Sequence, residues 1–195
     1  MSQHIHNSIK ALFTVLSSSD IHEILEKGDY VYTPKKKHII RAGTLDYKVI
    51  FLLDGMIRGF FINELGEEKN IFLRPAGTVT GAPECLFNDK PTKYSFEAMP
   101  ESKYITIERQ HLERLMESNP VFADIWVSAL QEIILTLISR VESLIAKTPE
   151  QRYQDLIVKR PSFFQKAYNK HIANYLGMTS VSLSRIIKRN SQKRN

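Results

Sequence analysis

Several features that mark secreted, membrane-bound or iron–sulfur proteins are missing from the sequence. Cysteine occurs once, at Cys85, which excludes an internal disulfide and a multi-cysteine iron–sulfur cluster. The first ten residues lack a basic segment followed by an apolar core and a small-residue cleavage site. No apolar run approaches the roughly 20 residues that span a bilayer. These absences predict a cytoplasmic protein without a membrane partner.

Patterns typical of enzymes and metal sites are missing as well. The sequence has no G-x-S-x-G, no P-loop and no dinucleotide-binding fingerprint. Its six histidines lack the spacing of a zinc site, and His4 with His6 offers at most a weak metal site near the N-terminus. We therefore interpret the histidines as solvated surface residues. Glu67 and Glu68 follow Gly66 in a predicted turn, so we interpret them as solvated charge rather than as an acid/base pair. We expect no enzyme, no catalytic residue and no resident metal.

Positive charge is present, but it is unevenly distributed. The 195 residues are 43% hydrophobic with a net charge of +6, as expected of one large folded domain with a small second one. Residues 151–195 hold ten basic residues against the single acid Asp155, a net charge of +9, which leaves residues 1–150 at −3. This distribution favours a polyanion partner for the C-terminal quarter. The alternative is a basic tail that only aids solubility.

Hydrophobic periodicity divides the chain into three parts. Residues 8–27 show helical spacing, with N-caps available at residues 17–19. Residues 29–108 form short alternating runs separated by turn residues, with tight hairpins predicted at Asp54-Gly55 and Leu65-Gly66. Helical spacing returns at residues 109–117. Many short strands at regular spacing predict a β-barrel or sandwich.

The longest periodic segment runs from Pro120 to Lys147, 28 residues or about 42 Å of helix. Two apolar faces indicate that one packs on the β-domain and the other on a second copy of the helix. The alternative is a core helix in a monomer. The two stripes are Phe122, Trp126, Leu130, Ile133, Leu137, Val141 and Leu144, and Val121, Ile125, Ile134, Ile138 and Ile145.

Thr148 and Pro149 mark a hinge, because a residue before proline leaves the helical region and Thr148 with Gln151 forms a capping box. Further on, the sequence NKHIANYLGMTSVSLSRIIKR, residues 169–189, has helix-turn-helix spacing. The small Ala173 permits close helix crossing, and Gly177 suits a tight turn. The alternative is a helical hairpin that does not bind DNA.

If the second helix enters the major groove, Arg185 is the best candidate for a bidentate contact to guanine. Lys188, Arg189, Lys193 and Arg194 are expected to bind phosphates. The outward and N-terminal side chains that would face the DNA are Thr179, Ser180, Val181, Ser182, Ser184 and Arg185.

The order of these elements, with a Gly-x-x-x-Gly stretch from Gly77 to Gly81, resembles the Crp/Fnr family of bacterial transcription regulators. The resemblance implies an α+β fold with a cyclic-nucleotide-binding-like double-stranded β-roll in residues 1–118, a dimerisation helix in 119–147 and an all-α helix-turn-helix domain in 148–195. It also implies a homodimer through residues 120–147 on near-palindromic double-stranded DNA, a small-molecule effector in the β-roll and RNA polymerase as a candidate partner.

Two departures from the family pattern qualify these expectations. Family members that bind cyclic AMP use a Gly-Glu pair and, about ten residues on, an Arg-Ser or Arg-Thr pair. Here the candidate effector-binding residues are Gly81, Ala82, Glu84, Thr92 and Lys93. We therefore expect a different ligand, a partner protein or a vestigial pocket instead of cyclic AMP.

The second departure is the lack of a β-hairpin wing after the recognition helix. The basic residues 190–195 are expected to replace its backbone contacts only in part. A second hypothesis for the function is therefore a β-roll sensor or protein-interaction module whose helical end does not bind DNA.

Overall fold

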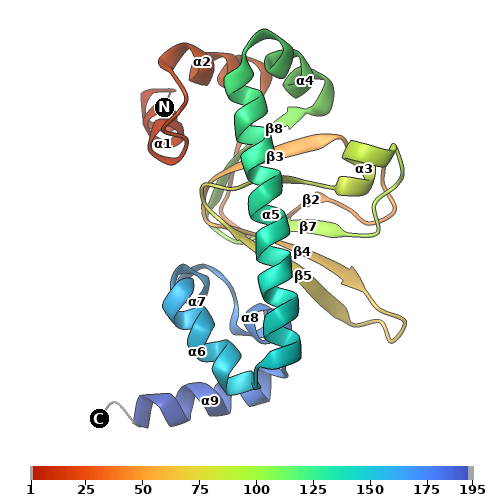
Figure 1. Ribbon diagram of the computed structural model, residues 1–195, viewed down its shortest axis with the longest axis vertical. Coiled ribbons are helices and arrows are strands. Elements are labelled where there is room, and N and C mark those ends of the chain that lie inside the picture. The colour runs from red at the N-terminus through yellow and green to blue at the C-terminus, as the bar shows by residue number, and fades with distance from the viewer. Residues whose placement is uncertain (1, 193–195) are drawn as a thin grey trace.

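The computed structural model describes residues 2–192. In this part of the chain, eight strands form two four-stranded antiparallel sheets with the orders β1-β8-β3-β6 and β2-β7-β4-β5. Helices flank the sheets and form the C-terminal end (Figure 1). The strands are β1 (Asp29–Thr33), β2 (Lys37–Ile40), β3 (Lys48–Asp54), β4 (Met56–Ile62), β5 (Glu68–Pro75), β6 (Val79–Gly81), β7 (Ser95–Ala98) and β8 (Ser102–Glu108). The predicted α+β fold with a β-roll is confirmed.

The alternation of side chains in β4 shows why the second sheet has two different faces. Ile57 points into the roll, where it packs with Ile50 and Phe96, whereas Met56 belongs to a cluster shared with the C-terminal helices. Arg58 is also buried and lies on the face of Met56, since successive side chains in a strand alternate. Both faces of this sheet are therefore covered.

The connection at Asp54-Gly55 is not a hairpin. β3 and β4 lie in different sheets, so this turn carries the chain from one sheet to the other. Gly55 has φ +87°, and a Cβ at this position would lie 2.3 Å from the Ser102 Oγ. The other predicted hairpin, at Leu65-Gly66, is confirmed by the pairing of β4 with β5. The sequence prediction also missed β6 and the short helix α3 (Pro83–Asn88).

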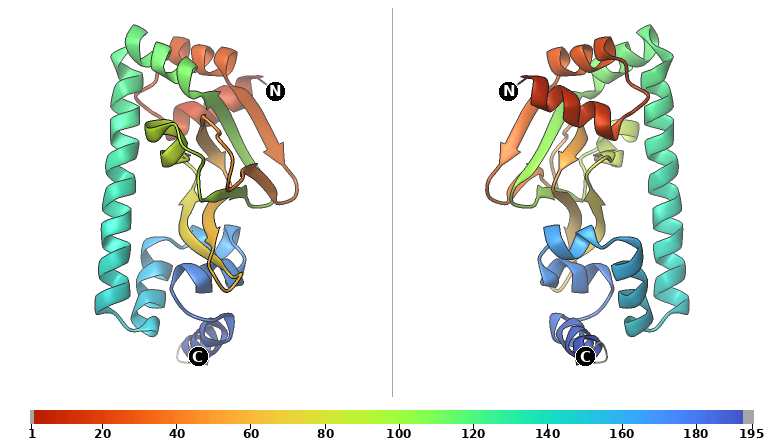
Figure 2. Two further views of the ribbon diagram at one scale, coloured as in Figure 1. Left: turned by 90° about the vertical axis from the view of Figure 1, so that its right-hand side faces the viewer. Right: turned by 90° about the vertical axis from the view of Figure 1, so that its left-hand side faces the viewer.

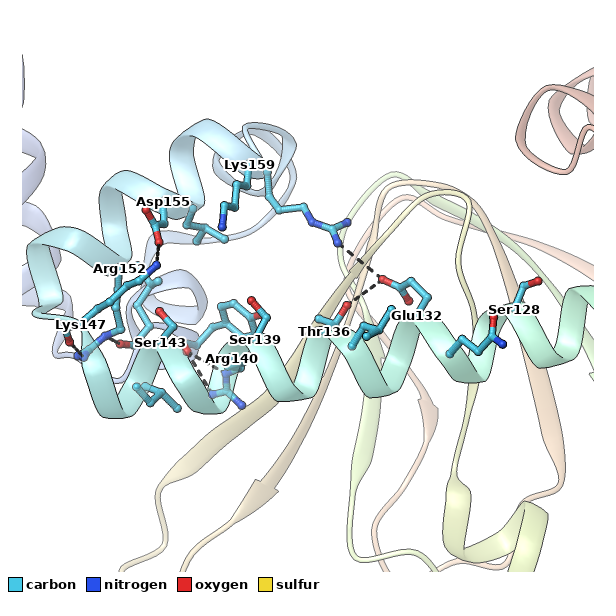
Figure 3. A pocket seen from close by; sticks show the side chains of 17 residues that line it. Ser128, Glu132, Thr136, Ser139, Arg140, Ser143, Lys147, Arg152, Asp155 and Lys159 are labelled. Carbon is cyan, nitrogen blue, oxygen red and sulfur yellow. Dashed lines mark hydrogen bonds and ion pairs between the residues drawn. The ribbon is translucent and has the colours of Figure 1, made fainter.

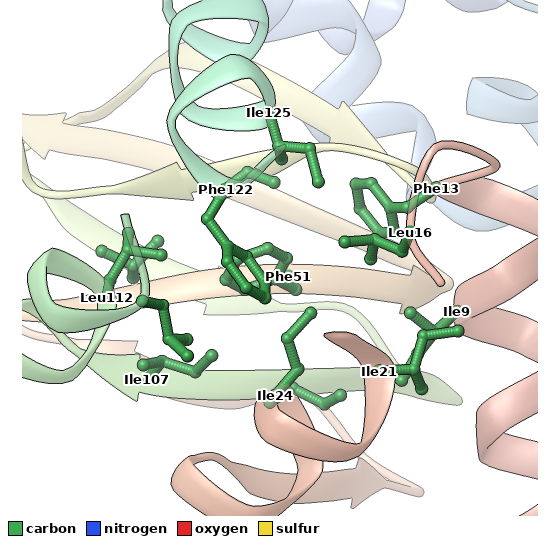
Figure 4. Packing of buried hydrophobic residues seen from close by; sticks show 14 of the residues in the cluster. Ile9, Phe13, Leu16, Ile21, Ile24, Phe51, Ile107, Leu112, Phe122 and Ile125 are labelled. Carbon is green, nitrogen blue, oxygen red and sulfur yellow. The ribbon is translucent and has the colours of Figure 1, made fainter. Parts of the chain in front are cut away.

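A core at one end of the roll joins the first sheet to the helices around it (Figure 4). Its buried side chains include Phe51 and Ile107 from the sheet and Phe122 from the long helix. Ser17 and Asp20 form a capping box that begins the second helix, as expected from the serine cluster. The helices that supply this core are α1 (Ser2–Leu12), α2 (Ser18–Lys27), α4 (Arg109–Ser118) and the start of α5 (Pro120–Ala146).

Helix α5 runs along one side of the molecule and connects the roll to the C-terminal helices (Figures 1 and 2). Of its residues only Phe122 and Ile125 are buried, so the two predicted stripes do not each face one partner. Residues from both stripes meet the roll at the N-terminal end, and most of the remaining apolar surface is exposed. The C-terminal helices are α6 (Pro149–Lys159), α7 (Ser162–Lys166), α8 (Asn169–Tyr175) and α9 (Ser180–Gln192).

By length and composition alone, α5 is apolar enough to cross a membrane. The sequence reading found no such run, because charged residues such as Glu132 and Arg140 interrupt the apolar residues. In the folded chain Glu132 binds Arg74 and Arg140 binds the Ile71 carbonyl, so both of these charged side chains of α5 face the roll.

Replacement of Gly55 by alanine should lower the free energy of unfolding by about 3 kcal/mol, because the new Cβ adds a clash with Ser102 to the cost of a positive φ. Gly43→Ala is the matched control: it has φ +84° but no atom within 4 Å of the added Cβ, so about 1 kcal/mol should be lost. Urea denaturation of both variants measures the difference, and equal losses would contradict the role of Ser102.

Candidate functional site

The helix-turn-helix consists of α8, a glycine turn and α9. Gly177 adopts φ +66°, and the Met178 amide donates to the Ala173 carbonyl at 3.0 Å, which closes the end of α8. The Ser182 amide donates to the Thr179 Oγ at 3.1 Å and begins α9 as the sequence indicated. Ala173 is 1% exposed at the crossing of the helices. The local sequence signals and the local structure therefore agree.

The structure places most of the predicted DNA-contact residues on the solvent side of α9. Ser182 is the exception, because it is half-buried and its hydroxyl lies 2.9 Å from the Thr179 hydroxyl. The Arg189 guanidinium lies 3.5 Å from a carboxylate oxygen of Glu150. Lys193 and Arg194 lie outside the described residues. The exposed residues are Thr179, Ser180, Val181, Ser184, Arg185, Lys188 and Arg189.

The opposite side of the helix-turn-helix packs on the β-roll. Met56, Leu73 and Met99 of the roll form one buried cluster with C-terminal residues that include Ile172 and Leu183. Burial of this apolar surface stabilises the contact between the two parts. The helix-turn-helix therefore shares a hydrophobic core with the second sheet.

Amide side chains make this contact specific. The backbone N–H of Asn70 donates to the Asn174 Oδ1 at 2.6 Å, and the Asn174 Nδ2 donates to the backbone carbonyl of Glu68 at 2.7 Å. The Asn70 Nδ2 in turn donates to the His171 carbonyl at 2.9 Å. These three bonds fix the position of α8 along β5.

A buried ionic cluster lies under this contact. The Arg58 side chain, 1% exposed, donates to Glu97 at 2.9 Å and to Glu68 at 2.7 Å. The hydrogen bond from Arg58 is the main cause that lowers the pKa of Glu68. Both predicted surface acids, Glu67 and Glu68, are exposed, but Glu68 also pairs with the buried Arg58, whereas Glu67 lies in the turn and pairs with Lys69.

His171 faces this cluster from α8. Its side chain is buried, its Nε2 has no hydrogen-bond partner in the described structure, and burial lowers its pKa to about 4. The positive charge of Arg58 contributes in the same direction. The sequence reading, which took all histidines as solvated surface residues, was wrong for His171.

Two arginines hold the end of α8 through backbone carbonyls. Arg140 of α5 donates to Asn70 and Ile71 of β5 at 3.0 and 2.8 Å, and to Tyr175 of α8 at 3.1 Å. Arg152 of α6 donates to Leu176 at 2.8 Å and to Lys147 at 2.6 Å (Figure 3). The sequence reading assigned no role to Arg140 or Arg152, because no local pattern identifies partners so distant in the chain.

Two of the five candidate effector residues bind each other. The Thr92 hydroxyl, in a side chain 1% exposed, donates to the Glu84 carboxylate at 3.0 Å. Ala82 is fully buried as the N-cap of α3, and a Cβ on Gly81 would lie 2.6 Å from Leu86. Lys93 is exposed, with its ammonium 5.3 Å from the centre of the Tyr94 ring. The residues therefore show no open anion site.

Aromatic and charged side chains fill the space beside this segment. A Cβ on Gly59 would lie 2.2 Å from the Phe72 ring, which packs edge-on against Phe96 at 5.2 Å between centroids. Arg74, 2% exposed, donates to the Glu132 carboxylate of α5 at 2.6 Å. Burial lowers the pKa of Arg74, whose Nε has no partner in the described structure.

The match to a known family decides the identity of the roll. The model of the cyclic nucleotide-binding domain matches residues 21–119, which include all eight described strands. The chain belongs to the cyclic nucleotide-binding domain family. The comparison with curated proteins found no match to this chain.

Solved structures extend the likeness of this cyclic nucleotide-binding domain protein to its C-terminal helices. FixK2 from Bradyrhizobium japonicum matches with a TM-score of 0.72 and 15% identity over 85% of each chain. The regulator CLP from Xanthomonas campestris, described as responsive to c-di-GMP, matches with 0.71 and 13% identity over 91% of this chain and 93% of CLP. A CooA mutant from Carboxydothermus hydrogenoformans matches with 0.68 and 15% identity over 87% and 79%. These matches confirm the Crp/Fnr-type fold.

The stability of this cyclic nucleotide-binding domain protein should fall between pH 6.5 and pH 4 because of His171. Its folded pKa of about 4 lies below the ordinary value of 6.5, so the unfolded chain takes up the proton first and up to about 3 kcal/mol is lost as the pH falls through this window. His171→Gln should flatten the pH dependence measured by urea denaturation. The exposed His22→Gln should leave it unchanged, and equal slopes in all three proteins would contradict the assignment.

Proposed function

We propose that the chain is a homodimeric transcription regulator of the Crp/Fnr type that binds near-palindromic double-stranded DNA in the cytoplasm, where it meets RNA polymerase. The observation that supports this most directly is the exposed face of α9. It carries hydroxyls at its N-terminal end and the cations Arg185, Lys188 and Arg189 further along. Recognition helices present such groups to base edges and phosphates in the major groove.

The position of α9 supports this role. Leu183 and Ile186 are buried against the remaining helices, and the opposite side of α9 is open to solvent at one end of the molecule (Figure 2). Arg185 lies in the middle of this open side and suits a bidentate contact to guanine. Lys188 and Arg189 lie one turn further on and suit phosphates, which determine affinity without reading sequence.

The exposed stripe of α5 supports a parallel dimer. Its members have exposed fractions of 50% to 81%, recur at heptad spacing and, by helical period, lie opposite Phe122 and Ile125, which are buried against the roll. A second copy of α5 would cover them and place two α9 helices on two half-sites related by the dimer axis. The stripe consists of Val127, Ile134, Ile138, Val141 and Ile145.

The contacts between Thr92 and Glu84 and the burial of Ala82 argue against cyclic AMP as the effector. A bound phosphate at this segment would need a cation beside it. Lys93 is exposed, and its ammonium lies over the Tyr94 ring. The proposed regulator therefore either takes another effector or works without one in the roll.

Ile138→Glu should weaken the dimer by at least about hundredfold, because a carboxylate would enter an apolar interface without a partner. Analytical ultracentrifugation over a concentration series measures this change. Leu135→Glu is the matched control, since Leu135 is 67% exposed but lies about 100° around the helix from Ile134. Equal effects of both variants, or a wild-type monomer, would contradict the proposed interface.

Arg185→Ala should relax base preference, with about 1–3 kcal/mol less discrimination at one position of each half-site. Lys188→Ala should instead weaken binding uniformly across sequences and reduce the dependence on salt. Mobility shifts on operator and unrelated DNA at several salt concentrations separate the two effects. The division of roles is wrong if both variants lose the same affinity on every DNA.

A further inference from the structure

A groove lies between α5 and α6, at the hinge between the long helix and the helix-turn-helix domain (Figure 3). Its volume is about 560 Å³, within the range of small-molecule sites. It is separate from the candidate effector residues near α3, since its walls come from α5, α6 and the end of α8. It is lined on the α5 side by the hydroxyls of Thr136, Ser139 and Ser143.

The charges that line the groove are unbalanced. Five cations contribute to its walls, against the two acids Glu132 and Asp155. Asp155 pairs with Lys147 within the groove. Glu132 is shared, because Arg74 donates to it at 2.6 Å and Arg160 lies 3.7 Å away. In the described structure neither acid lies at ion-pair distance from the other cations of the groove, which are Arg140, Arg152 and Lys159.

Among the described residues, Arg140 and Arg152 have hydrogen-bond partners but no acidic partner that neutralises their charge. Within residues 2–192 their hydrogen bonds all go to backbone carbonyls, and neither forms an ion pair with an acid. The Arg140 guanidinium also lies over the Tyr175 ring, 4.6 Å from its centre. Burial lowers the pKa of Arg140, as expected for a charge that is removed from water without an anion nearby. Their positive potential therefore extends into the groove.

Lys159 supplies the accessible cation. It is exposed, and Figure 3 shows its ammonium directed toward the space above α5. In the described part of the chain it makes no hydrogen bond or ion pair. Apolar side chains lie beside it in the same groove, among them Leu135, Leu144 and Leu156. A ligand that fits these walls has an apolar body and an anionic end.

We propose that this groove binds a small anionic amphiphile, with its carboxylate, sulfonate or phosphate near Lys159 and Arg160 and its apolar part against the leucines of α5 and α6. Binding itself does not depend on the proposed regulator function. Its consequence does: a ligand held by both α5 and α6 fixes the angle between the dimer helix and the DNA-binding domain.

The test uses 8-anilinonaphthalene-1-sulfonate as the probe, because this anion joins aromatic rings to a sulfonate and fluoresces when bound. Titration of the whole protein should show one saturable site per chain. The uncharged N-phenyl-1-naphthylamine, which lacks the sulfonate, should bind about fivefold more weakly. One charge contact contributes about 1 kcal/mol, which corresponds to this ratio of dissociation constants.

Two variants of equal charge change locate the site. Lys159→Gln should weaken probe binding about fivefold, whereas Lys35→Gln, at an exposed lysine between β1 and β2, should not change it. Thermal unfolding of both variants confirms that each remains folded. Equal weakening by both variants, equal binding of the neutral analogue, or no saturable binding would each overturn the proposal.

DNA binding is measured separately, so the two proposals fail in different ways. If the protein binds DNA but does not distinguish the sulfonate probe from its neutral analogue, only the groove is rejected as a ligand site. Selective probe binding without any mobility shift on DNA would reject only the regulator function.

Discussion

The guanidinium of Arg140 makes the contacts on which the arrangement of the whole molecule depends. It arises from α5 and reaches carbonyls of both β5 and α8, so the long helix, the roll and the helix-turn-helix meet at one side chain. A guanidinium suits this task, since its fixed donors point in several directions at once. Withdrawal of any one element would leave a half-buried cation with unsatisfied donors, which costs free energy.

Asn70 and Arg58 extend this constraint into the second sheet. Asn70 bonds to α8 through both its backbone and its side chain, and it also accepts a hydrogen bond from Arg58 at 3.3 Å. Arg58 in turn binds Glu97 on the neighbouring strand. Any change in the packing of β4, β5 and β7 therefore reaches α8 through paired polar groups, whose loss is costly in a buried setting.

Much of the fold was predictable because its signals are local. Strand alternation, the capping box at Thr148 and the turn at Gly177 each depend on a few neighbouring residues. The hairpin prediction at Asp54-Gly55 failed because a local turn signal does not show which sheet the next strand joins. For the same reason the site was predicted only in part. The exposed face of α9 follows from helical period, whereas the bonds of Arg140 and Thr92 join residues without any shared pattern.

Glu132 limits how α5 can move. The carboxylate lies between Arg74 of the roll and Arg160 at the end of α6. The proposed dimer stripe of α5 lies on another face, so a rotation of the helix about its axis would also carry Glu132 away from both arginines. A change of twist between the two long helices of the proposed dimer would therefore alter the contacts of both the roll and the C-terminal helices of each copy in a single step.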